Sequence, residues 1–236
     1  MFLKDKLVNS FAFYFAYHRH PVNKLIHIIT IPIIVWTVFV FLDYIPPMWV
    51  SDNPNPEIRG VFCLHWSLVP IVLYLALYYM MDAFAAVIMT LCIALWYLLA
   101  SMYVYYVQPQ PVGTGVAVGI HVVAWVFQFL GHGVWEKRKP ALFDSLIQAF
   151  LMAPFFVLLE VLFSCGYNRK LQKQIEDRAQ YFIAGFEENQ LDGEYPEAIV
   201  GRSPYEKTPI LKKTTDPINI SGRSSYQREE NARSYT

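Results

Sequence analysis

A histidine and a glutamate, His132 and Glu136, lie where a long apolar run gives way to a basic segment. If this stretch is helical, their spacing of four residues puts both side chains on one face. Imidazoles and carboxylates are common metal ligands, so the pair has the composition of half a metal site. The glycines on either side of His132 leave bare backbone that an ion or a substrate can approach. Such pairs also arise freely at solvated helix ends, so their chemistry depends on which other residues they meet.

The other histidines of the chain are His18, His20, His27, His65 and His121, and none of them lies in the C-terminal tail. Each is a possible partner for the pair. An ionisable side chain beside an apolar segment is costly and requires a partner. For any one of these histidines alone, a hydrogen bond within the protein is the commoner arrangement. Which of them can share a ligand depends on the segments that carry them.

The composition indicates a membrane protein. Of the 236 residues, 55% are hydrophobic and 17% are aromatic, which exceeds the apolar content of ordinary soluble domains. The formal net charge is zero, so the chain lacks the basic field of a nucleic-acid-binding protein. The three cysteines are widely spaced in apolar runs, which favours core positions over a disulfide framework.

Four apolar runs are long enough to cross a bilayer: residues 25–42, with a kink expected at Pro32, and residues 61–79, 83–107 and 114–130. Residues 2–17 have apolar side chains at helical spacing and predict an amphipathic helix at the membrane surface. The run 142–163 is interrupted by polar residues and by Pro154. We therefore predict an all-α, polytopic transmembrane helical bundle of about four spans, with interfacial or re-entrant helices.

Basic residues indicate the orientation of this bundle. Lysines and arginines precede the first span and follow the fourth, which predicts that both termini are cytosolic. We divide the chain into a transmembrane domain (residues 1–170), a surface helix (171–186) and a cytosolic tail (187–236). The tail is rich in proline, serine, threonine, asparagine and charge, which predicts disorder.

Only some of the histidines fall at the same depth in this topology. His18 precedes the first span, His27 lies in its first turn and His132 ends the fourth, so all three lie at the cytosolic interface and can meet. His121 would be about 16 Å from His132 along a continuous helix, too far to share an ion. His65 opens the second span and lies at the opposite face.

Three imidazoles, or two with the Glu136 carboxylate, would suit ferrous iron, Fe(2+), with positions left for oxygen and substrate. Zinc accepts the same donors. Glu136 can instead orient a ligating imidazole through a hydrogen bond, without binding the ion itself. Glu160, inside the fifth apolar run, pairs with a histidine, with the basic residues 137–139 or with water. Asn23 is placed to cap the first span.

Three segments resemble the 2-hydroxy-fatty-acid dioxygenase family of the endoplasmic reticulum: residues 17–27 (YHRHPVNKLIH), 125–142 (WVFQFLGHGVWEKRKPAL) and the stretch 153–160. The resemblance covers about residues 1–170. It implies a small, multi-spanning, iron(II)-dependent enzyme of the endoplasmic reticulum membrane that shortens a long-chain 2-hydroxy fatty acid by one carbon with O2. It also implies a place in the conversion of phytosphingosine to odd-numbered fatty acids, a part of sphingolipid metabolism.

By this resemblance, His18, His27 and His132 are the motif histidines and Glu136 is the motif acid. Our hypothesis adds that Arg19, or Lys137 and Arg138 in the basic loop, holds the anionic head of the substrate. Substrate, O2 and membrane lipid are then the expected partners, without nucleic acid or an obligate protein partner. The alternatives are a non-catalytic lipid-binding scaffold or transporter, and a zinc-dependent membrane hydrolase.

Overall fold

The computed structural model describes residues 2–61, 63–136 and 146–187 of the chain. These residues form α1 (Phe2–Tyr17), α2 (Pro21–Asp43), α3 (Pro56–Val61), α4 (Leu68–Met81), α5 (Ala83–Tyr106), α6 (Gln110–Leu130), the π-helical turn η1 (Gly131–Glu136), α7 (Leu146–Ser164) and α8 (Arg169–Glu187). Within the described ranges the β pairing is an isolated bridge between Trp49 and Leu64. The predicted all-α membrane fold is confirmed. Of the predicted tail, residues 187–236, the structure describes only Glu187, which ends α8.

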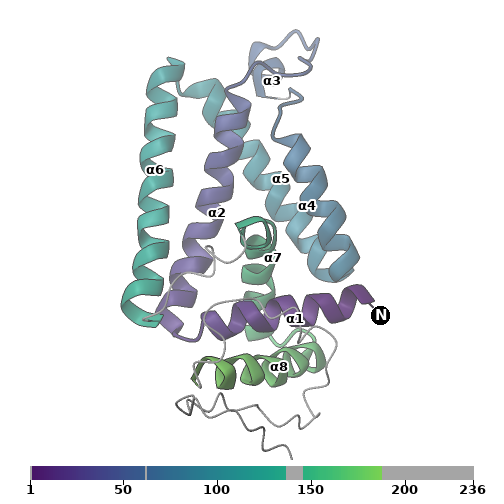
Figure 1. The fold of residues 1–236 in the computed structure, drawn as a ribbon. Coiled ribbons are helices and arrows are strands. Elements are labelled where there is room, and N and C mark those ends of the chain that lie inside the picture. The colour runs from purple at the N-terminus through teal and green to yellow at the C-terminus, as the bar shows by residue number, and fades with distance from the viewer. Residues whose placement is uncertain (1, 62, 137–145, 188–236) are drawn as a thin grey trace, which may run out of the picture. The chain divides into compact units, whose positions relative to one another are not determined.

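Three helical segments are long and apolar enough to cross a bilayer: α2, α5 and the continuous α6–η1 (Gln110–Glu136). They run roughly along one direction beside each other (Figure 1). The prediction of a span over residues 61–79 is wrong in its extent, because α4 begins only at Leu68 and has 14 residues. A helix of that length is about 21 Å long, shorter than the roughly 30 Å hydrocarbon core. The fifth apolar run forms a pair, α7 with α8, that is bent by 117°.

Helix α1 lies between α8 and the bundle, and it crosses the direction of the spans (Figure 1). Phe13 meets Phe182 of α8 edge-on at 5.6 Å between ring centroids, whereas Phe11 stacks on Phe156 of α7 at 4.8 Å. Consecutive residues of α1, from Phe11 to Tyr14, are therefore buried on every side. These residues have no exposed face, because α8 covers the side of α1 that faces away from α7, while the place of this helix at the membrane surface stays a prediction.

The residue that caps the start of α2 is not the one that the sequence predicted. His20 is the N-cap, and its Nδ1 accepts a hydrogen bond from the backbone N–H of Val22. Pro21 takes the first helical position, where its fixed φ and missing N–H are tolerated. Asn23 is therefore inside the helix and is not its cap. The helix continues through Pro32 without a break.

Polar side chains join α2 to α6, which run antiparallel. Gln128 donates to Thr30 at 2.7 Å, and His121 Nδ1 lies 2.7 Å from the Thr37 hydroxyl. The two pairs are spaced by seven residues on each helix, so they lie along one seam. This seam fixes how the end of α6 meets the beginning of α2, where the histidines lie.

Candidate metal centre

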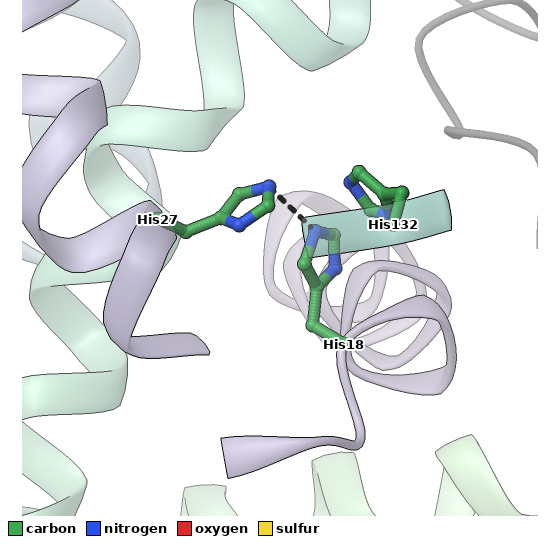
Figure 2. A group of neighbouring side chains, drawn as sticks. All are labelled: His18, His27 and His132. Carbon is green, nitrogen blue, oxygen red and sulfur yellow. Dashed lines mark hydrogen bonds between the residues drawn. The ribbon is translucent and has the colours of Figure 1, made fainter. Parts of the chain in front are cut away.

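Three histidines from separate elements converge at the end of the bundle that α1 crosses. His18 lies in the short link between α1 and α2, His27 lies within α2, and His132 lies in η1. Figure 2 shows the three rings facing one another, and one ligand nitrogen from each lies within 4.8 Å of the other two. Their exposed fractions are 4%, 4% and 5%. The three histidines expected to meet are thus brought together.

Backbone carbonyls determine the tautomers of two of these rings. Nδ1 of His18 lies 2.7 Å from the carbonyl oxygen of Tyr14, and Nδ1 of His27 lies 2.9 Å from that of Asn23. A carbonyl oxygen only accepts, so both Nδ1 atoms carry the proton. In the neutral rings, both Nε2 atoms then present lone pairs. These two Nε2 atoms lie 3.1 Å apart.

This arrangement fits a metal ion. Two facing lone pairs repel each other unless a cation binds both. A proton on His18 is disfavoured, because burial, followed by the fields of His27 and His132, lowers its pKa well below the usual value. Nitrogens about 2.1 Å from one ion lie about 3.0 to 3.4 Å apart at right or tetrahedral angles. Nδ1 of His132 is buried without a hydrogen-bond partner, so this third ring is also available for coordination.

The turn that carries His132 is held against α2 by Asn23 and Glu136. Glu136 Oε1 accepts hydrogen bonds from the backbone N–H of His20, at 2.8 Å, and from Asn23 Nδ2, at 3.1 Å. A Cβ on Gly131 would collide with Asn23 Oδ1, whereas one on Gly133 would meet nothing within 4 Å. The space expected beside both glycines is therefore open only at Gly133. Glu136 is bonded to the start of α2 and is not part of the histidine group.

A lysine–glutamate pair lies beside the histidines. Lys24 Nζ is 2.6 Å from Glu160 Oε1, and the two side chains are 23% and 12% exposed. The predicted partners of Glu160 were a histidine, the basic loop or water, so Lys24 corrects that expectation. Tyr14 stacks on His18 with 3.9 Å between ring centroids. Burial, and then the charge of Glu160, raise the pKa of Tyr14 well above its usual value.

Lys24 and Tyr14 were not among the predicted site residues, although the sequence contains a signal for each. Lys24 lies three residues before His27, and Tyr14 lies four residues before His18. On a helix these spacings place side chains next to each other. Of the residues expected to hold the substrate head, Arg19 is exposed, and Lys137 and Arg138 lie outside the described residues.

The remaining histidines have other surroundings. His121 Nε2 accepts from Trp125 Nε1 at 3.0 Å, and its Nδ1 is paired with Thr37, so both ring nitrogens are satisfied. His65 lies at the far end of the bundle, where it lines a cavity of about 580 Å³ together with Asp43 and Arg59. Burial lowers the pKa of His65. Neither histidine belongs to the converging group.

A protein-family model described as 2-hydroxy-palmitic acid dioxygenase Mpo1-like matches residues 5–165. The chain is also 29% identical over 170 residues to the protein named 2-hydroxy-palmitic acid dioxygenase MPO1 of Saccharomyces cerevisiae. That alignment covers 72% of this chain and 87% of the yeast protein. No solved structure matches the chain significantly. The range matched by the family model contains all three converging histidines and the Lys24–Glu160 pair.

Proposed function

The chain belongs to the Mpo1-like family, and we propose that it is an iron(II)-dependent dioxygenase that shortens long-chain 2-hydroxy fatty acids by one carbon. The name of the yeast relative, a 2-hydroxy-palmitic acid dioxygenase, supports the substrate class. The observation that carries the metal-dependent part is the approach of two unprotonated Nε2 atoms to 3.1 Å beside a third histidine.

His18, His27 and His132 would hold the ion, and Glu136 and Asn23 would keep the turn that carries His132 in place. Ferrous iron would supply the electrons and the open coordination positions that activation of O2 requires. Three nitrogen ligands leave positions for a substrate, as in other non-haem iron oxygenases. Burial of the three rings excludes bulk water from the reacting atoms.

The proposed reaction balances without a further reductant. A 2-hydroxy acid and O2 yield the fatty acid one carbon shorter, carbon dioxide and water. The C1–C2 bond breaks, C2 is oxidised from an alcohol to a carboxyl group, C1 leaves as carbon dioxide, and O2 accepts all the electrons released. The reaction therefore belongs to fatty acid α-oxidation.

The position of the histidines suits a substrate with a polar head and a long apolar tail. They lie where α2 begins and where α6 ends, so the head would react at the membrane interface while the tail stays in lipid. The apolar helices support a multi-pass membrane protein. We place it in the endoplasmic reticulum because of the family resemblance, with both termini cytosolic because of the basic residues that flank the spans. Phytosphingosine breakdown is the pathway in which we place the enzyme.

Metal exchange with a defined substrate tests this function. The purified protein, stripped of metal by a chelator, is reloaded anaerobically with Fe(II) or Zn(II) and supplied with O2 and 2-hydroxypalmitate labelled at C1. We expect pentadecanoate and labelled carbon dioxide in equal amounts from the Fe(II) protein and neither product from the Zn(II) protein. Equal turnover with zinc, or no shortened acid with iron, would contradict the proposal.

Matched histidine variants locate the reaction. His132→Ala should lose bound iron and at least a hundredfold of activity, since it removes one of three proposed ligands. His121→Gln, on the adjoining helix, should retain its iron, because His121 is paired with Thr37 and Trp125. Full activity and iron content in His132→Ala would show that the metal is bound elsewhere.

A further inference from the structure

Several residues at or beside the three histidines have buried polar atoms without hydrogen-bond partners. In the described part of the chain they include Tyr14 Oη, Asn23 Oδ1 and His132 Nδ1. Neither carboxylate oxygen of Glu160 receives a well-aligned hydrogen bond either, although Oε1 forms the ion pair with Lys24. Buried polar atoms in proteins are nearly always paired, so such a group indicates where a polar ligand binds. The cation that pairs with Glu160 is the ammonium of Lys24.

Three elements hold this ammonium in place. Lys24 extends from α2, Glu160 reaches it from α7, and the ring of Phe15 on α1 lies 4.2 Å from Nζ. A lysine has three N–H donors, and the ion pair with Glu160 engages at most one of them. The aromatic face of Phe15 offers a cation–π contact but no second oxygen acceptor. The ammonium thus keeps the capacity to donate to another oxygen.

Lys24 is close to the converging rings. It precedes His27 by three residues on α2, which is a rise of about 4.5 Å and places the two residues next to each other on the helix surface. The positive charge of Lys24 also contributes to the lowered pKa of His18. In a 2-hydroxy acid the carboxylate is attached directly to the hydroxyl-bearing carbon. A cation that binds this carboxylate must therefore lie beside the groups that handle the hydroxyl.

The charges in this region favour an anionic ligand once a divalent ion is bound. Lys24 and Glu160 cancel each other, and Glu136 adds one negative charge, which a divalent cation would more than offset. A carboxylate placed there would bring the site closer to neutrality, which matters in a buried environment because charge is poorly screened.

We infer that Lys24 receives the carboxylate of the acid substrate and that Glu160 is a positioning residue that holds the Lys24 ammonium in place; the inference rests on the proposed function. Lys24 lies in the first turn of α2, at the end of this candidate span, where a lysine side chain can reach the level of lipid heads. The apolar tail then extends along the spans. This assignment differs from the expectation that Arg19, Lys137 or Arg138 binds the head.

Binding to protein loaded with Zn(II), which is redox-inert, tests this inference separately from turnover. Pentadecanoate and pentadecanol have the same chain and differ in the head, so the ratio of their dissociation constants in lipid nanodiscs reports carboxylate recognition. The wild type should prefer the acid. Lys24→Met should reduce that preference about ten- to hundredfold, as expected for loss of a charge-assisted hydrogen bond. Lys24→Arg, which keeps the charge, should retain most of it, and Lys173→Met on the exposed side of α8 should retain all of it.

Several results would overturn the assignment. These are a wild type that binds alcohol as tightly as acid, an unchanged preference in Lys24→Met, or an equal loss in Arg19→Met. Because these measurements need neither iron nor catalysis, failure of the dioxygenase activity would leave them interpretable. In the iron-loaded enzyme, Lys24→Met should raise KM for 2-hydroxypalmitate about tenfold or more and change kcat much less.

A double-mutant cycle tests the role of Glu160. If Glu160 acts through Lys24, Glu160→Gln should reduce the acid preference severalfold in the wild type and have no further effect in the Lys24→Met background. Glutamine keeps the shape and one acceptor oxygen, which protects the fold better than alanine. An equal effect of Glu160→Gln in both backgrounds would show a role independent of Lys24 and would overturn the positioning assignment.

Discussion

At the scale of single residues, backbone carbonyls orient two of the three converging imidazoles. His18 and His27 each donate Nδ1–H to the carbonyl four residues earlier, that of Tyr14 or Asn23. Any residue can supply such a carbonyl, so the orientation comes from helical geometry and needs no particular side chain. The result is a pair of Nε2 lone pairs directed to one place before any ion binds. Such pre-organisation lowers the entropic cost of binding.

Glu136 is predicted to act as a structural acceptor and not as a ligand or base. Its Oε1 accepts hydrogen bonds from His20 N–H and Asn23 Nδ2, and glutamine offers an oxygen in the same place. Glu136→Gln should therefore keep iron affinity and kcat within about threefold, whereas Glu136→Ala should lower iron affinity about 10- to 100-fold. Metal titration followed by steady-state kinetics measures both. An equal loss of iron affinity in Glu136→Gln and Glu136→Ala would indicate that the carboxylate charge itself is required.

The sequence predicted the part of the site that depends on the type of each residue and on its expected depth in the membrane. Histidines at the ends of apolar runs must lie near the interface, and this limited the choice to His18, His27 and His132. The partner of Glu160 could not be predicted, because it depends on how closely α7 approaches α2. Lys24 is one of several basic residues before the first span, and its contacts with Glu160 and Phe15 distinguish it from Arg19.

At the scale of elements, the π-helical turn η1 changes which residue faces α2. Thr30 pairs with Gln128, and Asn23 lies seven residues before Thr30 on the same side of α2. A regular step of seven from Gln128 leads to Trp135, but the partner of Asn23 is Glu136. The wider turn accommodates one extra residue. It therefore brings the carboxylate, instead of the indole, to the seam between α2 and η1.

The two glycines of η1 allow a matched test of this close packing. Gly131→Ala places a methyl group against the Asn23 side chain and should push η1 away from α2, lowering iron affinity and activity at least tenfold. Gly133→Ala faces open space and should leave both unchanged. Metal titration of the two variants provides the comparison. A harmless Gly131→Ala would show that His132 does not depend on the contact between Asn23 and η1.

Helix type and order were predictable from apolar runs, but two boundaries were not. The run 61–79 is continuous in hydrophobicity, yet α4 starts at Leu68 because Ser67 donates to Asp43 at 2.5 Å and the chain before it is not helical. Residues 2–17 looked amphipathic, but α8 packs on their second face. Both differences come from tertiary contacts between distant segments, which local periodicity does not encode.

The bond between Ser67 and Asp43 should contribute measurably to stability. Asp43 is 2% exposed and accepts hydrogen bonds from Ser67 of α4's N-terminus and, at 3.3 Å, from Ser101 of α5. Ser67→Ala should lower the free energy of unfolding by about 1.5 to 3 kcal/mol, because the buried carboxylate loses its shorter bond. Ser164→Ala, at an exposed position, is the control and should change it by less than about 0.5 kcal/mol. Thermal unfolding in detergent, followed by circular dichroism, compares the stability of the two variants with that of the wild type.

At the scale of the whole described bundle, the two ends differ in construction. The end crossed by α1 and α8 contains the converging histidines and is covered by helices (Figure 1). At the other end, Asp43, Arg59 and His65 are among the residues that line a cavity of about 580 Å³. The covered end is the one that excludes water from the histidines.

The proposed orientation can be tested with thiols at these two ends. Cys165 is exposed between α7 and α8, at the histidine end, whereas Asp52 is exposed in the segment between α2 and α3. In sealed microsomes, a membrane-impermeant maleimide should label Cys165 of the wild type without detergent, since basic residues place that end in the cytosol. Asp52→Cys, in a Cys165→Ser background, should react only after permeabilisation. The reverse pattern would put the histidines on the lumenal side, and a cytosolic pool of 2-hydroxy acid would then reach them only by crossing the bilayer.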